Sequence, residues 1–192
     1  MEAHKISVKF FVDTPWAVGA HEFVAVFHSW IQLHSVPDHM LIDVADYDHV
    51  HNGPGTVLIS HEANFSTDHA DGRLGLMYLR KQPAAGAFAD RLRQAFIAAM
   101  EACIRLEEDP RLSGRIKFRT DEALLKIHDR LLAPNTAETM SAVKPDLQRL
   151  AAQLYPVDEL LLEHTPSPDA MFEVRIKVPS APDLTTLLSR LR

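Results

Sequence analysis

The chain lacks several features that would identify its class at once. Cys103 is the single cysteine among 192 residues, so the chain can form no internal disulfide and has no cysteine pair for a zinc site. No apolar run approaches the roughly 20 residues that span a bilayer, and the first residues carry no signal-peptide core. We therefore expect a cytoplasmic protein without membrane contact, in which Cys103 is a small buried hydrophobe.

An excess of positive charge and the well-marked catalytic motifs are missing as well. The chain has 20 Lys and Arg residues and 26 Asp and Glu residues, and its formal net charge of −6 argues against non-specific nucleic-acid binding. The sequence contains no Gly-x-x-x-x-Gly-Lys-[Ser/Thr] phosphate loop, no Gly-x-Ser-x-Gly elbow and no Gly-x-Gly-x-x-Gly fingerprint. We therefore expect no nucleic acid as a partner, and no motif names a reaction.

The chain does contain strand and helix patterns along its length. Apolar side chains at every second position predict strands over residues 6–12, 40–44, 56–65, 74–81, 115–119, 159–164 and 171–178. Three-and-four spacing predicts helices over residues 21–34, 84–109 and 135–155, and a C-terminal helix capped by Ser180. Pro145 predicts a kink or a fresh start inside the third helix. The three strands between residues 40 and 81 should form an antiparallel meander.

Residues 120–132 fit two structures. Thr120 could cap a helix, whereas Leu125, Ile127 and Leu131 alternate with their neighbours as in a strand. The strand is favoured by a faint duplication, since residues 1–81 and 115–192 each show a β-α-β-β order on either side of the helix over 84–109. We predict one α+β domain over residues 1–192, with a mostly antiparallel sheet, helices packed against it and this internal duplication.

Histidine and carboxylate side chains collect between Asp43 and His69, around the turn Gly53-Pro54-Gly55. These side chains bind metals, transfer protons and titrate near neutral pH. The cluster therefore indicates a site at this end of the meander. Tyr47 and Trp16 are loop aromatics that could line a pocket, although surface packing is their commoner role.

One hypothesis is a divalent metal site, for zinc or iron, built from His49, His51 and Glu62 together with His61. The spacing His-x-His puts two imidazoles on the same side of a strand. A regular hairpin around residues 52–55 would place His61 opposite Asp46 and on the other face, so a bulge or a wide loop would be needed to gather all the ligands.

The same hairpin geometry predicts that His61 lies beside Asp46. A carboxylate that orients an imidazole supports general acid–base catalysis, and Arg73 or Arg80 on the neighbouring strand would then hold an anionic substrate. Such an enzyme would be a metal-independent hydrolase or lyase. The alternative is a buried polar pair that only satisfies its own hydrogen bonds.

Three functional hypotheses follow from these residues. The first is a small-ligand or partner-binding protein without catalysis, in which a polar ligand contacts Tyr47, Asp48, Arg73 and Arg80. The second is the acid–base enzyme, and the third is the metalloprotein, whose cofactor would be the divalent metal. A homodimer through an edge strand is expected because an antiparallel sheet leaves its edges unpaired.

Overall fold

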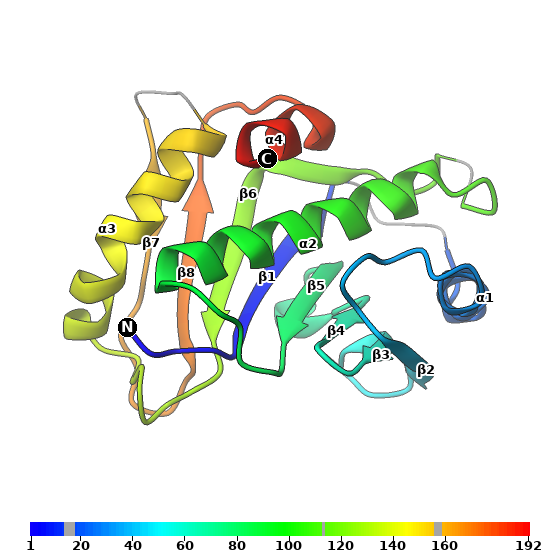
Figure 1. The fold of residues 1–192 in the computed structure, drawn as a ribbon, viewed down its shortest axis with the longest axis horizontal. Helices are drawn as coiled ribbons and strands as arrows, with labels where there is room; N and C mark the ends of the chain where they lie inside the picture. The colour runs from blue at the N-terminus through cyan, green and yellow to red at the C-terminus, as the bar shows by residue number, and fades with distance from the viewer. Residues whose placement is uncertain (14–17, 113, 156–158) are drawn as a thin grey trace.

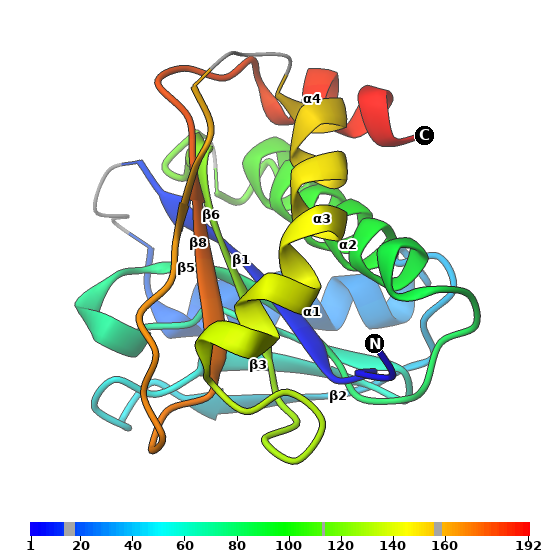
Figure 2. The same ribbon diagram turned by 90° about the vertical axis from the view of Figure 1, so that its left-hand side faces the viewer.

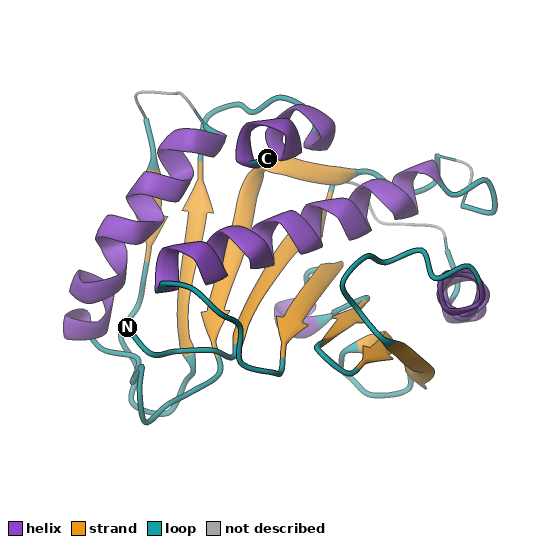
Figure 3. Cartoon of the chain, viewed as in Figure 1, coloured by secondary structure: helices purple, strands orange, loops and turns teal. Residues whose placement is uncertain are grey.

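Four α-helices pack against one antiparallel sheet of eight strands in the part of the chain that the computed structural model describes, residues 1–13, 18–112, 114–155 and 159–192 (Figures 1 and 3). The predicted α+β class is therefore confirmed, while Trp16 lies outside the described residues. The strands are β1 (Ile6–Val12), β2 (Leu41–Tyr47), β3 (Gly55–Ser60), β4 (Ala63–Ser66), β5 (Gly75–Arg80), β6 (Phe118–Ile127), β7 (Leu161–Glu163) and β8 (Phe172–Lys177). The helices are α1 (Ala20–Gln32), α2 (Phe88–Glu108), α3 (Ala137–Leu154) and α4 (Leu184–Leu191), with a short 3-10 helix η1 (Ala70–Gly72).

Strand β1 lies near the middle of the sheet, whose order is β2-β3-β4-β5-β1-β6-β8-β7. Its alternating side chains divide the molecule into two sides, because successive residues of a strand point to opposite faces. Phe10 meets Phe96 of α2, so Ile6 and Val8 point with it to the helix side, and Ser7 and Lys9 point to the other side. All four α-helices lie on the first side (Figures 1 and 2). The sheet thus has one face covered by the α-helices and one face without an α-helix, which we call the open face, although residues 68–73 bury Lys9 there.

A single hydrophobic cluster fills the space between the sheet and the helices. Helix α2 crosses β1 and β5, where the rings of Phe96 and Phe10 meet edge-on with their centroids 6.2 Å apart. Helix α1 covers β2 and β3 and buries Phe23 and Phe27. Each fully buried ring stabilises the fold by about 1.5–3 kcal/mol. Cys103 is fully buried in this cluster, and its burial raises the pKa of the thiol well above the ordinary value.

The predicted strand over residues 56–65 is in fact two strands. The chain turns back at His61 and Glu62, so that β3 pairs with β4 and the meander from β2 to β5 has four strands. The Ser60 hydroxyl closes this turn, since it donates to the carbonyl of Ala63 at 2.7 Å and accepts from the amide of Ala63 at 2.9 Å. No glycine or proline marks the turn, which explains why the apolar pattern suggested one long strand.

Three further expectations can be compared with the structure. Residues 118–127 are strand β6, so the strand interpretation is correct as far as Ile127, and a turn follows. Helix α4 is capped by Asp183, whose carboxylate accepts from the amide of Thr186, and not by Ser180. Helix α3 continues through Pro145 without a new start. Pro145 lies on the exposed side of α3, where water can satisfy the carbonyl group that its missing N–H leaves free.

The predicted duplication is not confirmed. Both halves of the chain contain the order strand, helix, strand, strand, but β4 and β5 separate β1 from β3 in the first half, whereas β6 pairs directly with β8 in the second. One continuous sheet and one core run through both halves. Among the described residues, none of the helices combines the length and the apolar character that crossing a membrane requires.

Candidate functional site

The hairpin register places His61 and Asp46 at opposite ends of strand β3. Asp46 pairs with Thr56, and the amide of His61 donates to the carbonyl of Met40 at 2.9 Å. His61 lies five positions after Thr56, a distance of about 16 Å at roughly 3.3 Å per residue. The predicted register is therefore wrong, and the structure does not bring these two side chains together. The cause is the loop between β2 and β3, which is longer than a four-residue turn.

This loop, residues 48–54, also separates the predicted metal ligands. Two successive turns close it, with hydrogen bonds from the Val50 amide to the Tyr47 carbonyl and from the Gly53 amide to the Val50 carbonyl. His49 and His51 lie in these turns, exposed, and not on a strand face. Among the residues that the structure describes, no three His, Cys, Asp or Glu side chains are grouped so that they could hold a metal ion.

Two other predicted ligand-binding residues lie at the start of this loop, Asp48 within it and Tyr47 at the end of β2. Asp48 approaches His69, with Oδ1 and Nε2 3.6 Å apart, and both side chains are partly exposed to solvent. The Tyr47 ring is 43% exposed, with its centroid 6.4 Å from that of His49. These contacts are open and loosely packed, so the loop offers no enclosed site.

Glu62 lies at the other end of the hairpin. Its carboxylate accepts from the backbone amide of Met40 at 2.7 Å and so ties the β3–β4 turn to the start of β2. Partial burial alone would raise the pKa of Glu62. Backbone hydrogen bonds to its carboxylate and the electrostatic effect of the nearby His39 and His61 outweigh this, so the pKa is lowered overall. Glu62 is therefore a negative charge with a structural partner at the edge of the sheet.

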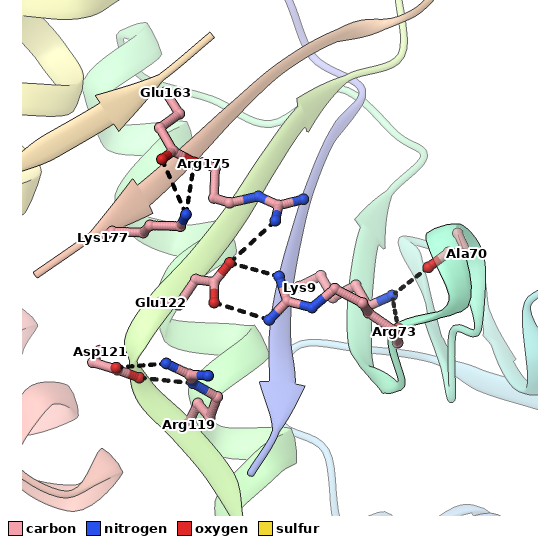
Figure 4. A network of polar contacts seen from close by, with 9 residues as sticks. All are labelled: Lys9, Ala70, Arg73, Arg119, Asp121, Glu122, Glu163, Arg175 and Lys177. Carbon is pink, nitrogen blue, oxygen red and sulfur yellow. Dashed lines mark hydrogen bonds and ion pairs between the residues drawn. The ribbon is translucent and has the colours of Figure 1, made fainter. Parts of the chain in front are cut away.

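Arg73 belongs to a polar network on the open face of the sheet, not to the meander site in which it was predicted (Figure 4). Its guanidinium donates to both carboxylate oxygens of Glu122, at 2.7 and 2.9 Å, and lies 3.8 Å from the ring centroid of Phe11. Arg175 approaches the same carboxylate at 3.4 Å. Arg73, through its hydrogen bond above all, lowers the pKa of Glu122 despite its burial. Glu122 is thus held as an anion between two arginines.

A buried ion pair completes this group. Lys9 and Asp68, whose side chains are 2% and 6% exposed, lie 2.5 Å apart. The Lys9 ammonium also donates to the carbonyl of Arg73 at 2.6 Å, which fixes the loop before β5 against β1 (Figure 4). A buried charge costs several kcal/mol unless it is paired and hydrogen-bonded, and here it is both. We refer to Lys9, Asp68, Arg73, Glu122 and Arg175 as the Glu122 network.

Arg80 lines a different feature, a cleft of about 290 Å³ on the covered side of the sheet. The walls of this cleft are residues 37–39, Tyr78 and Arg80 of β5, and the side of α2 between Gln94 and Glu101. We refer to it as the His39 cleft. Arg80 donates from Nε to the carbonyl of Gln82 at 3.0 Å and forms no ion pair with any described carboxylate. Its charge is therefore uncompensated.

The chain between α1 and β2 shapes the rim of the His39 cleft. Helix α1 ends in a Schellman motif, because the amide of Ser35 donates to the carbonyl of Trp30 and the amide of His34 donates to that of Ile31. His34 occupies the left-handed position of this motif at φ 49°, and Asp38 adopts φ 58°. Glycine is the usual residue at such angles, so the rim holds two residues in a sparsely populated conformation.

Tyr78 and His39 form a hydrogen-bonded chain beside Arg80. The His39 Nδ1 lies 2.7 Å from the carbonyl oxygen of Pro37, which places the proton of the neutral imidazole on Nδ1. Nε2 then accepts from the Tyr78 hydroxyl at 3.4 Å. Burial raises the pKa of Tyr78, while a hydrogen bond from Arg80 and its charge oppose this shift. Tyr78 therefore remains a neutral hydroxyl near pH 7.

A second, smaller cavity adjoins the cleft and shares Tyr78, Arg80 and Gln94 as walls. Its volume of about 10 Å³ is enough for one water molecule. The Nδ1 atom of His4, which also lines it, is buried without a hydrogen-bond partner. This unpaired atom is a group that a water molecule in the small cavity could satisfy.

Two wider grooves, of about 500 and 450 Å³, lie elsewhere on the molecule. Each lysine or arginine that lines them is already paired with a carboxylate: Lys117 with Glu107, Arg119 with Asp121, and Lys177 with Glu163. The His39 cleft differs because its cation is not paired, and we therefore regard it as the candidate site.

Comparisons of this chain with protein-family models, with curated proteins and with solved structures find no match. The candidate site therefore depends on geometry alone. Of its residues, the sequence pointed only to Arg80, and His39 and Tyr78 were missed. The sequence did hold one indication of the site, because Tyr78 and Arg80 are two residues apart and so share one face of a strand. The proximity of these two residues to residues 37–39 follows only from the fold.

Proposed function

We propose that this protein binds a small polar ligand in the His39 cleft, without catalysis. The observation that supports this most strongly is the uncompensated charge of Arg80 beside the hydroxyl of Tyr78 and the imidazole of His39. Small-molecule sites combine a mainly apolar concave surface with a few converging polar groups, and this cleft has that composition.

Arg80 differs from several other arginines of the protein, although Arg91, Arg93 and Arg190 likewise donate to backbone carbonyls and not to carboxylates. Arg73, Arg111 and Arg119 each donate to a carboxylate through two nitrogen atoms. An arginine carries five N–H donors, and a partly buried one that lacks an anion leaves interaction energy available to a ligand. A bound anion would supply the partner that the protein itself does not provide.

The test is a thermal-shift and NMR titration of the full chain with three probes of similar size: benzoate, benzamide and phenyl phosphate. We expect at least one probe to raise the melting temperature and to perturb amide signals of Tyr78, Arg80 and Gln94. Arg80→Gln and Tyr78→Phe should weaken this binding, while Arg149→Gln on the exposed side of α3 should not. The proposal would be contradicted if none of the three probes binds, or if the affinity is the same in the wild type and in both cleft variants.

Other predictions from the sequence keep their own tests. A hydrolase or lyase using His61 and Asp46 has no supporting contact in the structure. Turnover that is unaffected by Asp46→Asn would contradict this hypothesis.

A divalent metal at His49, His51 and Glu62 predicts stoichiometric metal in untagged protein, measured by plasma mass spectrometry. The same hypothesis predicts loss of the metal in a His49→Ala, His51→Ala variant.

Dimerisation through an edge strand and a cytoplasmic location also remain predictions. Strand β2 is one edge of the sheet, but Asp43 accepts from the amide of Val44 and Asp46 accepts from the amide of Asp48. These carboxylates place negative charge along the edge, a common way to discourage strand pairing. Sedimentation velocity at two protein concentrations measures the oligomeric state directly.

A further inference from the structure

The charges and donors around Arg80 restrict the chemical class of the ligand. We infer that the His39 cleft selects a monocarboxylate with a compact apolar body and discriminates against phosphate esters and neutral amides. This inference rests on the proposed function, because it assumes that the cleft is the binding site. It goes further by naming the group that Arg80 recognises.

The first argument is the balance of charge. Arg80 is the one uncompensated cation among the described residues that line the cleft. Asp38 lies on the rim, and the charge of Glu62 is close enough to raise the pKa of Tyr78. A monoanion would neutralise Arg80, whereas a phosphate dianion would add an uncompensated negative charge near two carboxylates.

The carboxylate at the far end of the cleft does not alter this balance. Glu101 is bound on one side by Arg192 at 2.5 Å and on the other by Arg105 at 3.6 Å. These arginines are engaged with Glu101, so they are not available as a second cation for a phosphate. The charge available to a ligand is therefore that of Arg80.

The second argument is the geometry of the donors. Phosphate sites commonly use free backbone N–H groups at the beginning of a helix or several cations. Helix α2 begins at Phe88, and it lines the cleft only from Gln94 onward, where backbone amides are already bonded within the helix. The available donors are side chains. A planar guanidinium matches the two oxygens of a carboxylate, and Tyr78 or Gln94 can donate a further hydrogen bond.

The third argument is the apolar wall. Ile97 and Ala98 occupy the middle of the α2 side of the cleft, and Pro37 lies on its rim. Gln94 and Glu101 are seven residues apart, which corresponds to about 10 Å along a helix at 1.5 Å per residue. A ligand bound at Arg80 would therefore extend over a short apolar surface, so its body should be small and carry few polar groups.

The experiment compares the affinities of benzoate, benzamide and phenyl phosphate, measured by NMR titration at neutral pH with equal ionic strength. We expect benzoate to bind at least about tenfold more tightly than benzamide, as a charge-assisted hydrogen bond predicts. We expect a similar margin of about tenfold over phenyl phosphate, because its second negative charge has no partner in the cleft. Arg80→Gln should weaken benzoate binding by about tenfold or more and leave benzamide binding unchanged. Arg80→Lys keeps the positive charge but lacks the planar guanidinium that can donate two parallel hydrogen bonds. This variant should therefore recover only part of the lost benzoate affinity.

Failure of this inference can be distinguished from failure of the proposed function. Phenyl phosphate or benzamide binding as tightly as benzoate, while still depending on Tyr78 and Arg80, would overturn the inferred class and retain the site. No binding by any probe, in wild-type protein that is folded by its NMR spectrum, would overturn both. Arg149→Gln serves as the matched control, because it removes an exposed arginine far from the cleft in sequence.

Discussion

Two polar regions on opposite sides of the sheet use the same kinds of side chain in opposite ways. In the Glu122 network, the cations of Lys9 and Arg73 are matched by carboxylates. In the His39 cleft, Arg80 has no carboxylate partner, and the polar contacts of the Tyr78 hydroxyl are with the His39 imidazole, at 3.4 Å, and with Arg80. Paired groups stabilise the fold, whereas groups left unpaired beside a cavity are available for binding.

This difference has an energetic basis. Removing one member of a buried pair leaves an uncompensated charge, so each residue of the Glu122 network should be intolerant of change. Removing Arg80 leaves no unpaired buried anion behind, so its loss should cost little stability. The comparison therefore predicts that stability and binding respond to different residues, and the following variants test it.

The largest effect is expected for Asp68→Ala. This variant leaves the Lys9 ammonium buried without its anion, so we expect the free energy of unfolding to fall by about 3–5 kcal/mol. Urea denaturation monitored by circular dichroism measures the change. A double variant, Lys9→Met with Asp68→Leu, replaces the charges with apolar groups and should recover most of the loss. Equal destabilisation in both variants would show that packing, and not the charge, is responsible.

A smaller loss, about 1–2 kcal/mol near pH 7, is expected for Glu122→Gln, because Arg73 and Arg175 remain partly solvated. The pKa of Glu122 lies below its ordinary value of 4.5 in the folded protein, chiefly because Arg73 donates to it. The stabilisation by the charged carboxylate is therefore complete above 4.5 and is lost as the pH falls through the lowered pKa. The difference between variant and wild type should shrink in acid, and a pH-independent difference would refute this account.

A gain of about 0.5–1 kcal/mol is expected for His34→Gly, because glycine adopts φ 49° without the strain of a side chain. His28→Gly, on the exposed face of α1, is the matched control and should destabilise the protein by a similar amount, since there the helix conformation disfavours glycine. Thermal denaturation of both variants provides the comparison. The same sign for both would indicate that the rim of the cleft stores no strain.

The sequence was sufficient for the elements and not for their pairing. Alternation in β1 and the apolar stripe through Phe96 and Cys103 predicted a strand and a helix that the structure contains. The register of β2 on β3 was mispredicted because the connection over residues 48–54 is longer than a four-residue turn. The division of residues 56–65 into β3 and β4 was missed because the side chain of Ser60 closes a turn that contains no glycine or proline. The local sequence pattern predicts whether a segment is a strand or a helix. The position and length of each turn determine which residues of two paired strands lie opposite one another.

The candidate site was harder to predict for a related reason. Arg73 and Arg80 both looked like ligand-binding residues, since each is a cation near the end of a strand. Only the fold shows that Arg73 meets Glu122, 49 residues away, and that Arg80 meets no carboxylate. His39 and Tyr78 are likewise 39 residues apart. Whether a charged residue is paired depends on contacts distant in sequence, so composition alone cannot separate a structural arginine from a binding one.

These two arginines provide the most direct test of the account. Arg73→Gln and Arg80→Gln make the same chemical change, and each variant should be measured for both its free energy of unfolding and its affinity for benzoate. We predict that Arg73→Gln loses about 1–2 kcal/mol of stability and binds benzoate as the wild type does, whereas Arg80→Gln keeps its stability within about 0.5 kcal/mol and loses binding. Benzoate binding that survives Arg80→Gln, or that is lost in a folded Arg73→Gln variant, would contradict the assignment of the His39 cleft as the binding site.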